Sequence, residues 1–210
     1  ILGQWVAADG LIYQQFADNV EQYLINEEDL KKYNIMYAVI GVDFGGTKSA
    51  HSFTLTGFTE GYQKVVVLDE YYCKKRIDPK HLQEDFIDFV KRAQTKYKVF
   101  EAYCDSAEQT LISGLESACI QAGVRIELRN AIKGPINDRI AFYNSLISQN
   151  RWKIMEHCKH IREAFEQAVY DDKKPNQDVR LDDGVMNVDS LDSTEYSTES
   201  VQNDILYIAA

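Results

Sequence analysis

The sequence predicts an α/β fold built on a mixed sheet, in which three antiparallel strands are followed by helix-linked parallel strands and flanked by helices. The continuous apolar run at 38–42 is typical of a strand that is covered on both faces. Two β-prone segments follow it closely, and apolar residues at helical spacing then alternate with short β-prone runs. The closely spaced strands predict an antiparallel meander, and the later alternation of helical and β-prone segments predicts helix-linked crossover units.

Short turns join the first three predicted strands. After the run at 38–42, Ser49–Phe58 alternates apolar and polar residues, and Tyr62–Cys73 is rich in Val and Tyr. Thr59-Glu60-Gly61 between them is typical of a hairpin turn. We therefore expect three consecutive strands in an antiparallel arrangement.

Asp43 directly follows the first strand and precedes Phe44-Gly45-Gly46. Because neighbours in a strand point to opposite faces, Val42 and Phe44 are expected to point away from the Asp43 side chain. The glycines allow a sharp turn and leave open space beside the carboxylate, which is room for an ion or a phosphate. The alternative is an ordinary hairpin turn in which Asp43 caps a free amide.

A helix and a fourth strand come next. Asp78 is suited to cap a helix with Pro79 at its first position, and apolar residues then share one helical face: Leu82, Phe86, Phe89, Val90 and Ala93. Lys98–Cys104 predicts the fourth strand, which ends on Asp105. Because crossover connections are right-handed, this strand is expected beside the first, which would bring Asp43 and Asp105 to one edge of the sheet.

The rest of the chain is predicted to be mainly helical. A helix at 107–122 stops at Gly123, and a fifth strand covers Val124–Leu128. The later segments are, in chain order, a loop at 129–137, a helix at 136–148, a short strand at 152–155, a helix at 157–170, an exposed loop at 171–186 and a closing helix at 187–206.

Size and charge limit the possible functions. A chain of 210 residues that is 45% apolar can bury one substantial core, so we expect one domain at 35–210, with 1–34 as a linker or the tail of a preceding domain. The start without Met indicates a piece of a longer protein, and the lack of a signal peptide or long apolar run predicts a soluble, cytoplasmic protein. The four scattered cysteines indicate reduced thiols. The net charge of −10 argues against non-specific coating of nucleic acid, but it does not exclude an enzyme that acts on it.

Carboxylates at the predicted sheet edge indicate a metal site. Asp43 and Asp105 would be joined there by an acid from the closing helix, for which the candidates are Asp189, Asp192 and Glu195. Hard oxygen ligands of this kind bind Mg²⁺ together with substrate phosphate. Two such ions about 4 Å apart can activate water and stabilise the leaving oxygen of a phosphodiester. The residues alone therefore suggest phosphoryl chemistry.

Four motifs occur in order along the chain: VIGVDFGG, FEAYCDSAEQTLISGLESACIQAG, AIKGPINDRIAFY and VDSLDSTEYS. Together they resemble the nuclease domain of the large terminase subunit of tailed bacteriophages, and the opening LGQWVAADGLIYQQF is similar to the segment that joins the packaging ATPase to that nuclease. The resemblance implies a ribonuclease H-like fold and an endonuclease, dependent on Mg²⁺ or Mn²⁺ and holding two ions, that cuts concatemeric viral DNA during genome packaging. It also implies that the substrate is double-stranded DNA and that the protein acts in the cytoplasm of an infected bacterium, without a membrane. The partners that it implies are the ATPase domain, the small terminase subunit and the portal.

Matched motif to motif, the resemblance implies that Asp43, Asp105 and Asp192 are the catalytic acids and bind the metal. Many members have a His three residues before the last acid, where this chain has Asp189, whose role in metal binding stays open. As alternatives, Asp105 could merely cap the following helix, and Asp192 could be a solvated helix residue. The chain has no Gly-x-x-x-x-Gly-Lys-Ser/Thr phosphate loop, so it cannot itself be the ATPase.

Basic residues near the predicted site are candidates for contacts with DNA or its phosphates. Lys133 lies in a loop near the sheet edge, and Lys48 and Arg139 are further candidates. The alternative for Lys133 is an ordinary exposed cation.

Two other functions fit parts of the sequence. GVDFGGTKS also resembles the first phosphate-binding motif of sugar kinases with an actin-like fold, in which Asp-x-Gly-Gly-Thr holds ATP phosphates. Such kinases need a second ATP-binding domain, for which this chain is too short, and the motifs after Asp105 would be unexplained. A non-catalytic DNA-docking or assembly module is the third possibility, and it predicts no metal-dependent turnover.

Overall fold

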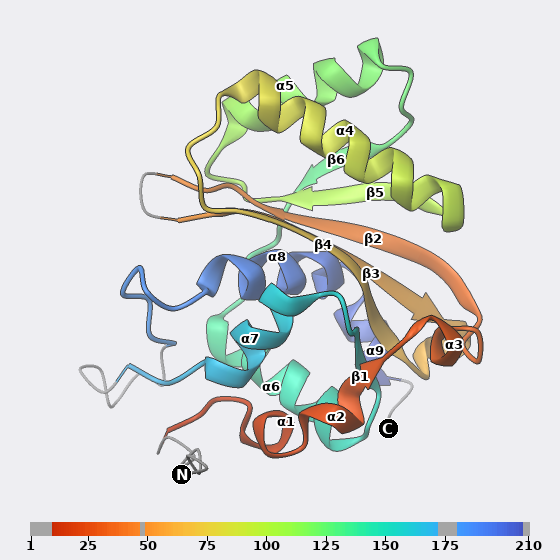
Figure 1. Ribbon diagram of the computed structural model, residues 1–210, viewed down its shortest axis with the longest axis vertical. Coiled ribbons are helices and arrows are strands. Elements are labelled where there is room, and N and C mark those ends of the chain that lie inside the picture. Colours follow the sequence, from red (N-terminus) through yellow and green to blue (C-terminus); the bar gives the residue numbers. More distant parts are fainter. Residues whose placement is uncertain (1–9, 47–48, 172–179, 208–210) are drawn as a thin grey trace, which may run out of the picture.

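The computed structural model describes residues 10–46, 49–171 and 180–207, which form one mixed sheet flanked by helices (Figure 1). The seven strands have the order β1-β7-β4-β3-β2-β5-β6. Their bounds are β1 (Leu24–Ile25), β2 (Ile35–Asp43), β3 (His51–Thr59), β4 (Val65–Cys73), β5 (Val99–Cys104), β6 (Glu127–Asn130) and β7 (Trp152–Met155). The pairs β2–β3 and β3–β4 are antiparallel and the other pairs are parallel, which confirms the predicted mixed α/β sheet.

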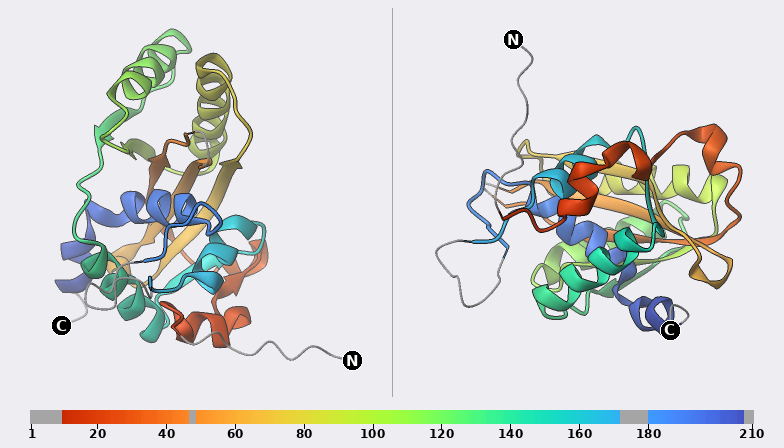
Figure 2. Two further views of the ribbon diagram at one scale, coloured as in Figure 1. Left: turned by 90° about the vertical axis from the view of Figure 1, so that its left-hand side faces the viewer. Right: turned by 90° about the horizontal axis from the view of Figure 1, so that it is seen from below.

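Helices cover both faces of the sheet (Figures 1 and 2). On one face α4 (Pro79–Lys96) packs beside α5 (Gln109–Gln121), and on the other α8 (Val188–Glu199) crosses β2, β3 and β5. Helices α1 and α6 pack behind α7, which contacts α8. The remaining bounds are α1 (Gln14–Asp18), α2 (Val20–Tyr23), α3 (Glu27–Leu30), the 3₁₀ turn η1 (Glu60–Tyr62), α6 (Ile136–Ser148), α7 (Lys159–Gln167) and α9 (Gln202–Tyr207).

The central strands bring the first two predicted acids to one end of the sheet. In the antiparallel pair β2–β3, Asp43 lies opposite Ser52, and in the parallel pair β2–β5, Val42 lies opposite Cys104. The next amide, that of Asp105, donates to the carbonyl oxygen of Val42 at 2.9 Å. The predicted return of the fourth strand to the side of the first is therefore confirmed.

Helix α8 lies close to the sheet because its contact face carries small hydroxyl side chains. The Ser193 and Ser197 hydroxyls hydrogen-bond to Thr54 and Thr56 at 2.8 and 2.6 Å. At Gly41 of β2, a Cβ atom would overlap the Ser193 carbonyl oxygen and lie 2.6 Å from the Ser197 amide nitrogen. A glycine is thus required where the helix crosses, and the crossing sets the position of the acids on α8.

The N-terminal segment belongs to the folded unit from residue 11 onward. Tyr13, Phe16 and Tyr23 are fully buried, and Phe16 and Tyr13 pack against the ring of Phe165 in α7. Strand β1 extends the sheet beyond β7. The boundary at residue 34 stays a prediction, because a segment that joins two domains can also pack onto one of them.

Several predicted elements shift in extent. Strand β6 occupies Glu127–Asn130 rather than 124–128, and the closing helix divides into α8 and α9 around Ser200. The cysteines are free thiols. Within the described ranges, the helices are too short or too polar to cross a membrane.

Candidate active site

Asp43 is the most deeply buried of the predicted site aspartates, with 7% of its surface exposed. It is the last residue of β2, and in the described part of the chain no hydrogen bond or ion pair reaches its carboxylate. Burial raises the pKa of Asp43 well above its usual range, and the charges of Asp192, Asp189 and Asp105 raise it further, while Lys133 opposes them. Asp43 is therefore a buried carboxyl group without a partner among the described residues, and the charges of three other acids act on it.

Asp105 follows β5 and is held in a turn. Its Oδ1 atom accepts a hydrogen bond from the amide of Ala107 at 2.8 Å and another from the Lys133 ammonium. The N-cap position of α5 is Glu108, so Asp105 supports the turn before the helix and does not cap the helix itself. No hydrogen bond from the described residues reaches its second oxygen, Oδ2.

Lys133 is fixed in place by its own backbone as well as by Asp105. It has a positive φ of 55°. The Glu199 carboxylate accepts hydrogen bonds from the amides of Ile132, Lys133 and Gly134 at 3.0, 3.1 and 3.2 Å. The Lys133 Nζ atom also lies 5.9 Å from the centre of the Tyr196 ring. The predicted loop cation is therefore directed at the acids, and its side chain remains 34% exposed.

Asp192 projects from α8 into a buried group of charges. Arg139 and Arg180 both contact its Oδ1 atom, at 3.2 and 2.5 Å, and both also pair with Glu195, at 2.5 and 2.8 Å. Burial raises the pKa of Glu195, which the two arginines counter. As at Asp105, the second oxygen of Asp192 receives no hydrogen bond from any described residue.

The other predicted residues have distinct positions. Asp189 accepts a hydrogen bond from the Ala50 amide at 2.8 Å, and burial followed by the charge of Asp192 raises its pKa. Arg139 is 8% exposed and directs its guanidinium at carboxylates, so this geometry gives no support to a direct phosphate contact. Lys48 lies outside the described residues.

Sequence reasoning missed two residues that support the site, Arg180 and Glu199. The prediction of an exposed loop at 171–186 is wrong for Arg180, since only 5% of its surface is exposed. A weak signal was available: Arg180 is the single cation between Pro175 and the last residue of the sequence, where acids dominate. Glu199 gave no signal, because its three amide partners come from a loop distant in sequence.

The donor set fits a hard divalent cation in its chemistry. Among the described residues, no three acid, His or Cys side chains are gathered closely enough to hold an ion as they stand. However, Asp43 has both carboxylate oxygens without a described donor, and Asp105 and Asp192 each have one. Oxygens of this kind are the ligands that Mg²⁺ and Mn²⁺ prefer. A cation would also relieve the repulsion that Asp43 receives from its neighbours.

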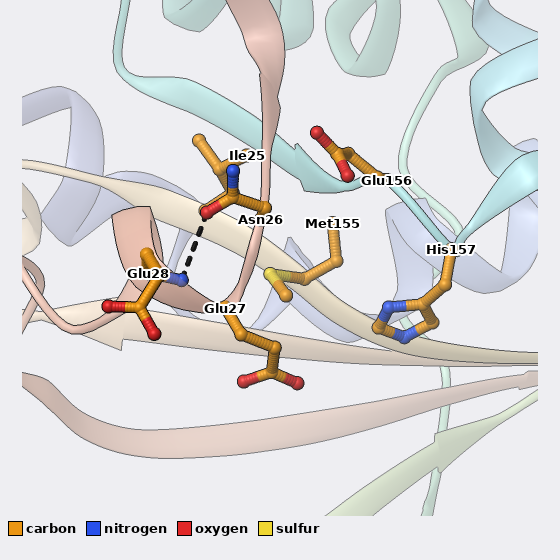
Figure 3. A pocket seen from close by; sticks show the side chains of 7 residues that line it. All are labelled: Ile25, Asn26, Glu27, Glu28, Met155, Glu156 and His157. Carbon is orange, nitrogen blue, oxygen red and sulfur yellow. Dashed lines mark hydrogen bonds between the residues drawn. The ribbon is translucent and has the colours of Figure 1, made fainter.

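A separate hollow of about 300 Å³ lies at the carboxyl ends of the edge strand β1 and its neighbour β7 (Figure 3). Figure 3 shows Glu27, Glu28, Glu156 and His157 around it. Two of these have partners elsewhere: Glu27 lies 3.7 Å from Lys96, and His157 lies 3.6 Å from Asp69. None of the predicted site residues lines this hollow.

The mixed seven-stranded sheet, with its antiparallel β2–β3–β4 pairs, its parallel flanking strands and helices on both faces, has a ribonuclease H-like fold. Neither a family model nor a curated protein sequence matches the chain. Solved structures do match, and they are large terminases of bacteriophages.

The large terminase of a thermophilic bacteriophage matches with a TM-score of 0.71 and 20% identity over 95% of this chain and 46% of that one. The nuclease domain of the P22 large terminase matches with a TM-score of 0.67 and 13% identity, and the match covers 95% of this chain and 99% of that one. The SPP1 large terminase nuclease domain with bound Mn matches with a TM-score of 0.61 and 18% identity, and the match covers 85% of this chain and 96% of that one. The chain therefore has the fold of large terminase nuclease domains, as its motifs suggested, and it spans about half the length of the thermophilic phage protein.

Proposed function

We propose that this chain is a divalent-metal-dependent DNA endonuclease, the nuclease part of a large terminase. The observation that carries the proposal is that Asp105 and Asp192, which come from distant parts of the chain, both lie near enough to the buried Asp43 for their charges to raise its pKa. The bound Mn in the SPP1 domain supports a metal requirement. In this proposal the substrate is double-stranded DNA in the cytoplasm of an infected bacterium. The partners are a packaging ATPase domain, the small terminase subunit and the portal.

Asp43, Asp105 and Asp192 would hold one or two Mg²⁺ or Mn²⁺ ions, with Asp189 as a further candidate ligand. Such ions supply an activated water and stabilise the charge on the leaving oxygen of a phosphodiester. The protein's own part is to orient the acids: the β2 and β5 strand ends fix Asp43 and Asp105, and the two arginines direct Asp192. Burial of Asp43 limits water around its carboxylate, which strengthens its attraction for a cation.

Lys133 is suited to act on the substrate. It is partly exposed and adjoins Asp105, so a phosphate that approaches the acids would meet its ammonium group. The Glu199 bonds hold the loop and limit the entropy lost when the lysine engages an anion. We therefore assign Lys133 the role of phosphate contact.

The test is cleavage of supercoiled plasmid with Mg²⁺, Mn²⁺ or EDTA. Wild-type protein should nick and linearise the plasmid only with metal, and Asp43→Asn should abolish both products. Asp88→Asn is the matched control, because it makes the same chemical change at an exposed position on α4 and should keep full activity. Hexose-dependent ATP consumption with intact plasmid would favour the sugar kinase, and the absence of either activity would favour a docking module.

A further inference from the structure

A second hollow, of about 360 Å³, lies just beyond the Asp43 end of β2, on the face of the sheet covered by α4 and α5, and Leu82 and Leu111 from these helices help to line it. One wall is the turn between β2 and β3, with Gly45, Gly46, Ser49 and His51, and the other is the connection from β4 to α4, which begins with Lys74-Lys75-Arg76. This run is absent from the motifs that suggested the nuclease. The hollow therefore combines a turn adjoining the candidate site with a cluster of cations that has no assigned role.

The sheet register places this hollow close to Asp43. Asp43 lies opposite Ser52 on β3, and Ser52 in turn lies opposite Tyr72 on β4. Tyr72 is therefore in line with Asp43 across the sheet, and Lys74 follows Tyr72 by two residues. Two strand spacings of about 4.8 Å separate the backbones of Asp43 and Tyr72 by roughly 10 Å. The cations and the acids thus share one end of the sheet.

The three cations are available to a ligand. Lys74, Lys75 and Arg76 are exposed, and none of them forms an ion pair with a described acid. Such a run is unusual in a chain with a net charge of −10, and mutual repulsion of three adjacent cations favours an anionic partner. The opposite wall is preorganised: the Gly45 amide donates to His51 Nδ1 at 3.0 Å, and the Gly46 amide donates to Ser49 Oγ at 2.7 Å.

We propose that Lys74, Lys75 and Arg76 bind backbone phosphates of the DNA strand at a short distance from the phosphate that is cleaved. The contact is to phosphate and not to base edges, so it holds the duplex in register over the acids without selecting a sequence. This inference rests on the proposed function, because it takes Asp43 and its neighbours as the cleavage site.

The experiment compares Lys74→Gln/Lys75→Gln/Arg76→Gln with the control Lys91→Gln/Lys98→Gln/Arg125→Gln. The control removes the same charge from exposed positions outside the hollow, before β5 and β6 and on α4. Binding of a fluorescent duplex of about three helical turns is measured by anisotropy over a range of salt, with Asp43→Asn present in every protein so that the duplex stays intact. Plasmid cleavage is measured separately with Asp43 restored.

The triple variant in the hollow should bind the duplex at least about tenfold more weakly at low salt. Its plot of log affinity against log salt should lose roughly 0.9 of slope for each phosphate contact removed. The control triple variant should have the same affinity and the same salt slope as the protein that carries Asp43→Asn alone. Cleavage by the hollow variant should recover at saturating DNA, because the acids are unchanged.

Equal affinity and equal salt slope in the two triple variants would overturn the inference, even if the plasmid is cut as proposed. Loss of binding in the hollow variant, combined with no cleavage by wild-type protein in any metal, would keep the DNA contact and reject the nuclease. Displacement of the duplex by inorganic phosphate at millimolar concentration would also overturn the inference, since it would indicate a site for small anions.

Discussion

Arg180 donates from Nη2 to the Oδ1 atom of Asp192 at 2.5 Å, and its other terminal nitrogen donates to Glu195 at 2.8 Å. The guanidinium thus spans two acids one turn apart on α8, and Arg139 contacts the same two acids. Because both arginines use Oδ1 of Asp192, the Oδ2 atom is left for a different partner. The group of four charges therefore orients one candidate ligand.

Arg180→Met should destabilise the protein by about 3–5 kcal/mol, because it removes a partner of buried carboxylates and leaves their charge uncompensated. Urea unfolding followed by circular dichroism measures this loss. The matched variant Arg180→Met/Glu195→Gln should recover part of the stability, since the excess negative charge is then gone. An unchanged unfolding midpoint for Arg180→Met would show that the group does not stabilise the fold.

Asp43→Asn should raise the melting temperature of the metal-free protein. The folded-state pKa of Asp43 lies above its unfolded value, so the ionised carboxyl destabilises the fold at neutral pH. Each kcal/mol relieved corresponds to about 2–4 °C in a protein of this size. The advantage of the variant should shrink as the pH falls through the raised pKa, because the folded wild type then carries a neutral carboxyl.

Scanning calorimetry in EDTA at several pH values measures the difference in melting temperature between Asp43→Asn and the wild type. Adding Mn²⁺ should reverse the order of stability, because the wild type would bind the ion more tightly and gain more from it. A variant that melts below the wild type in EDTA at neutral pH would contradict the burial argument.

Glu199→Gln should loosen the loop that carries Lys133. The neutral side chain keeps an oxygen acceptor but loses the charge that strengthens its bonds to three amides, at a cost of about 1–2 kcal/mol. Amide hydrogen exchange at 132–134 should accelerate, and plasmid cleavage at saturating DNA should fall. Glu163→Gln, at an exposed site on α7, is the control. Faster exchange without any change in cleavage would separate the loop from catalysis.

Gly41→Ala should displace α8 and with it Asp192. The added methyl group would meet backbone atoms of Ser193 and Ser197, which cannot rotate away, so a loss of at least about 1–3 kcal/mol is expected. Cleavage should be lost even at temperatures where circular dichroism shows a folded protein. Gly114→Ala in α5 is the control, because its methyl meets only the flexible end of Gln83 at 3.0 Å and favours the helix. Equal activity of the two variants would mean that α8 tolerates movement.

Local periodicity and chain topology predicted the elements that carry the site. The apolar face and the Asp78–Pro79 start predicted α4, and α6 and β7 match their predicted ranges. The handedness of crossovers placed β5 beside β2, and with it Asp105 near Asp43. These inferences succeed because they depend on contacts within one element or on a general rule for neighbouring strands.

Features that depend on packing between distant segments were not predictable in the same way. The aromatic residues of 11–30 lack a period, and they become core residues only through contact with Phe165 and its neighbours. Five of the eight buried residues of α8 are Ser or Thr, which are typical of a solvated helix. Its spacing of small residues at Ser190, Ser193 and Ser197 was the available sign of a close helix–sheet contact.

The hydroxyl contacts of α8 also determine how the helix can fail. An aliphatic interface tolerates slippage by a fraction of a turn, because one methyl group can replace another. Pairs such as Thr54–Ser193 and Thr56–Ser197 are discrete and break together when the helix slides. The helix can therefore pack against the strands in one position only. Asp192 should accordingly be either aligned with Asp43 and Asp105 or displaced from them by a full step of the helix.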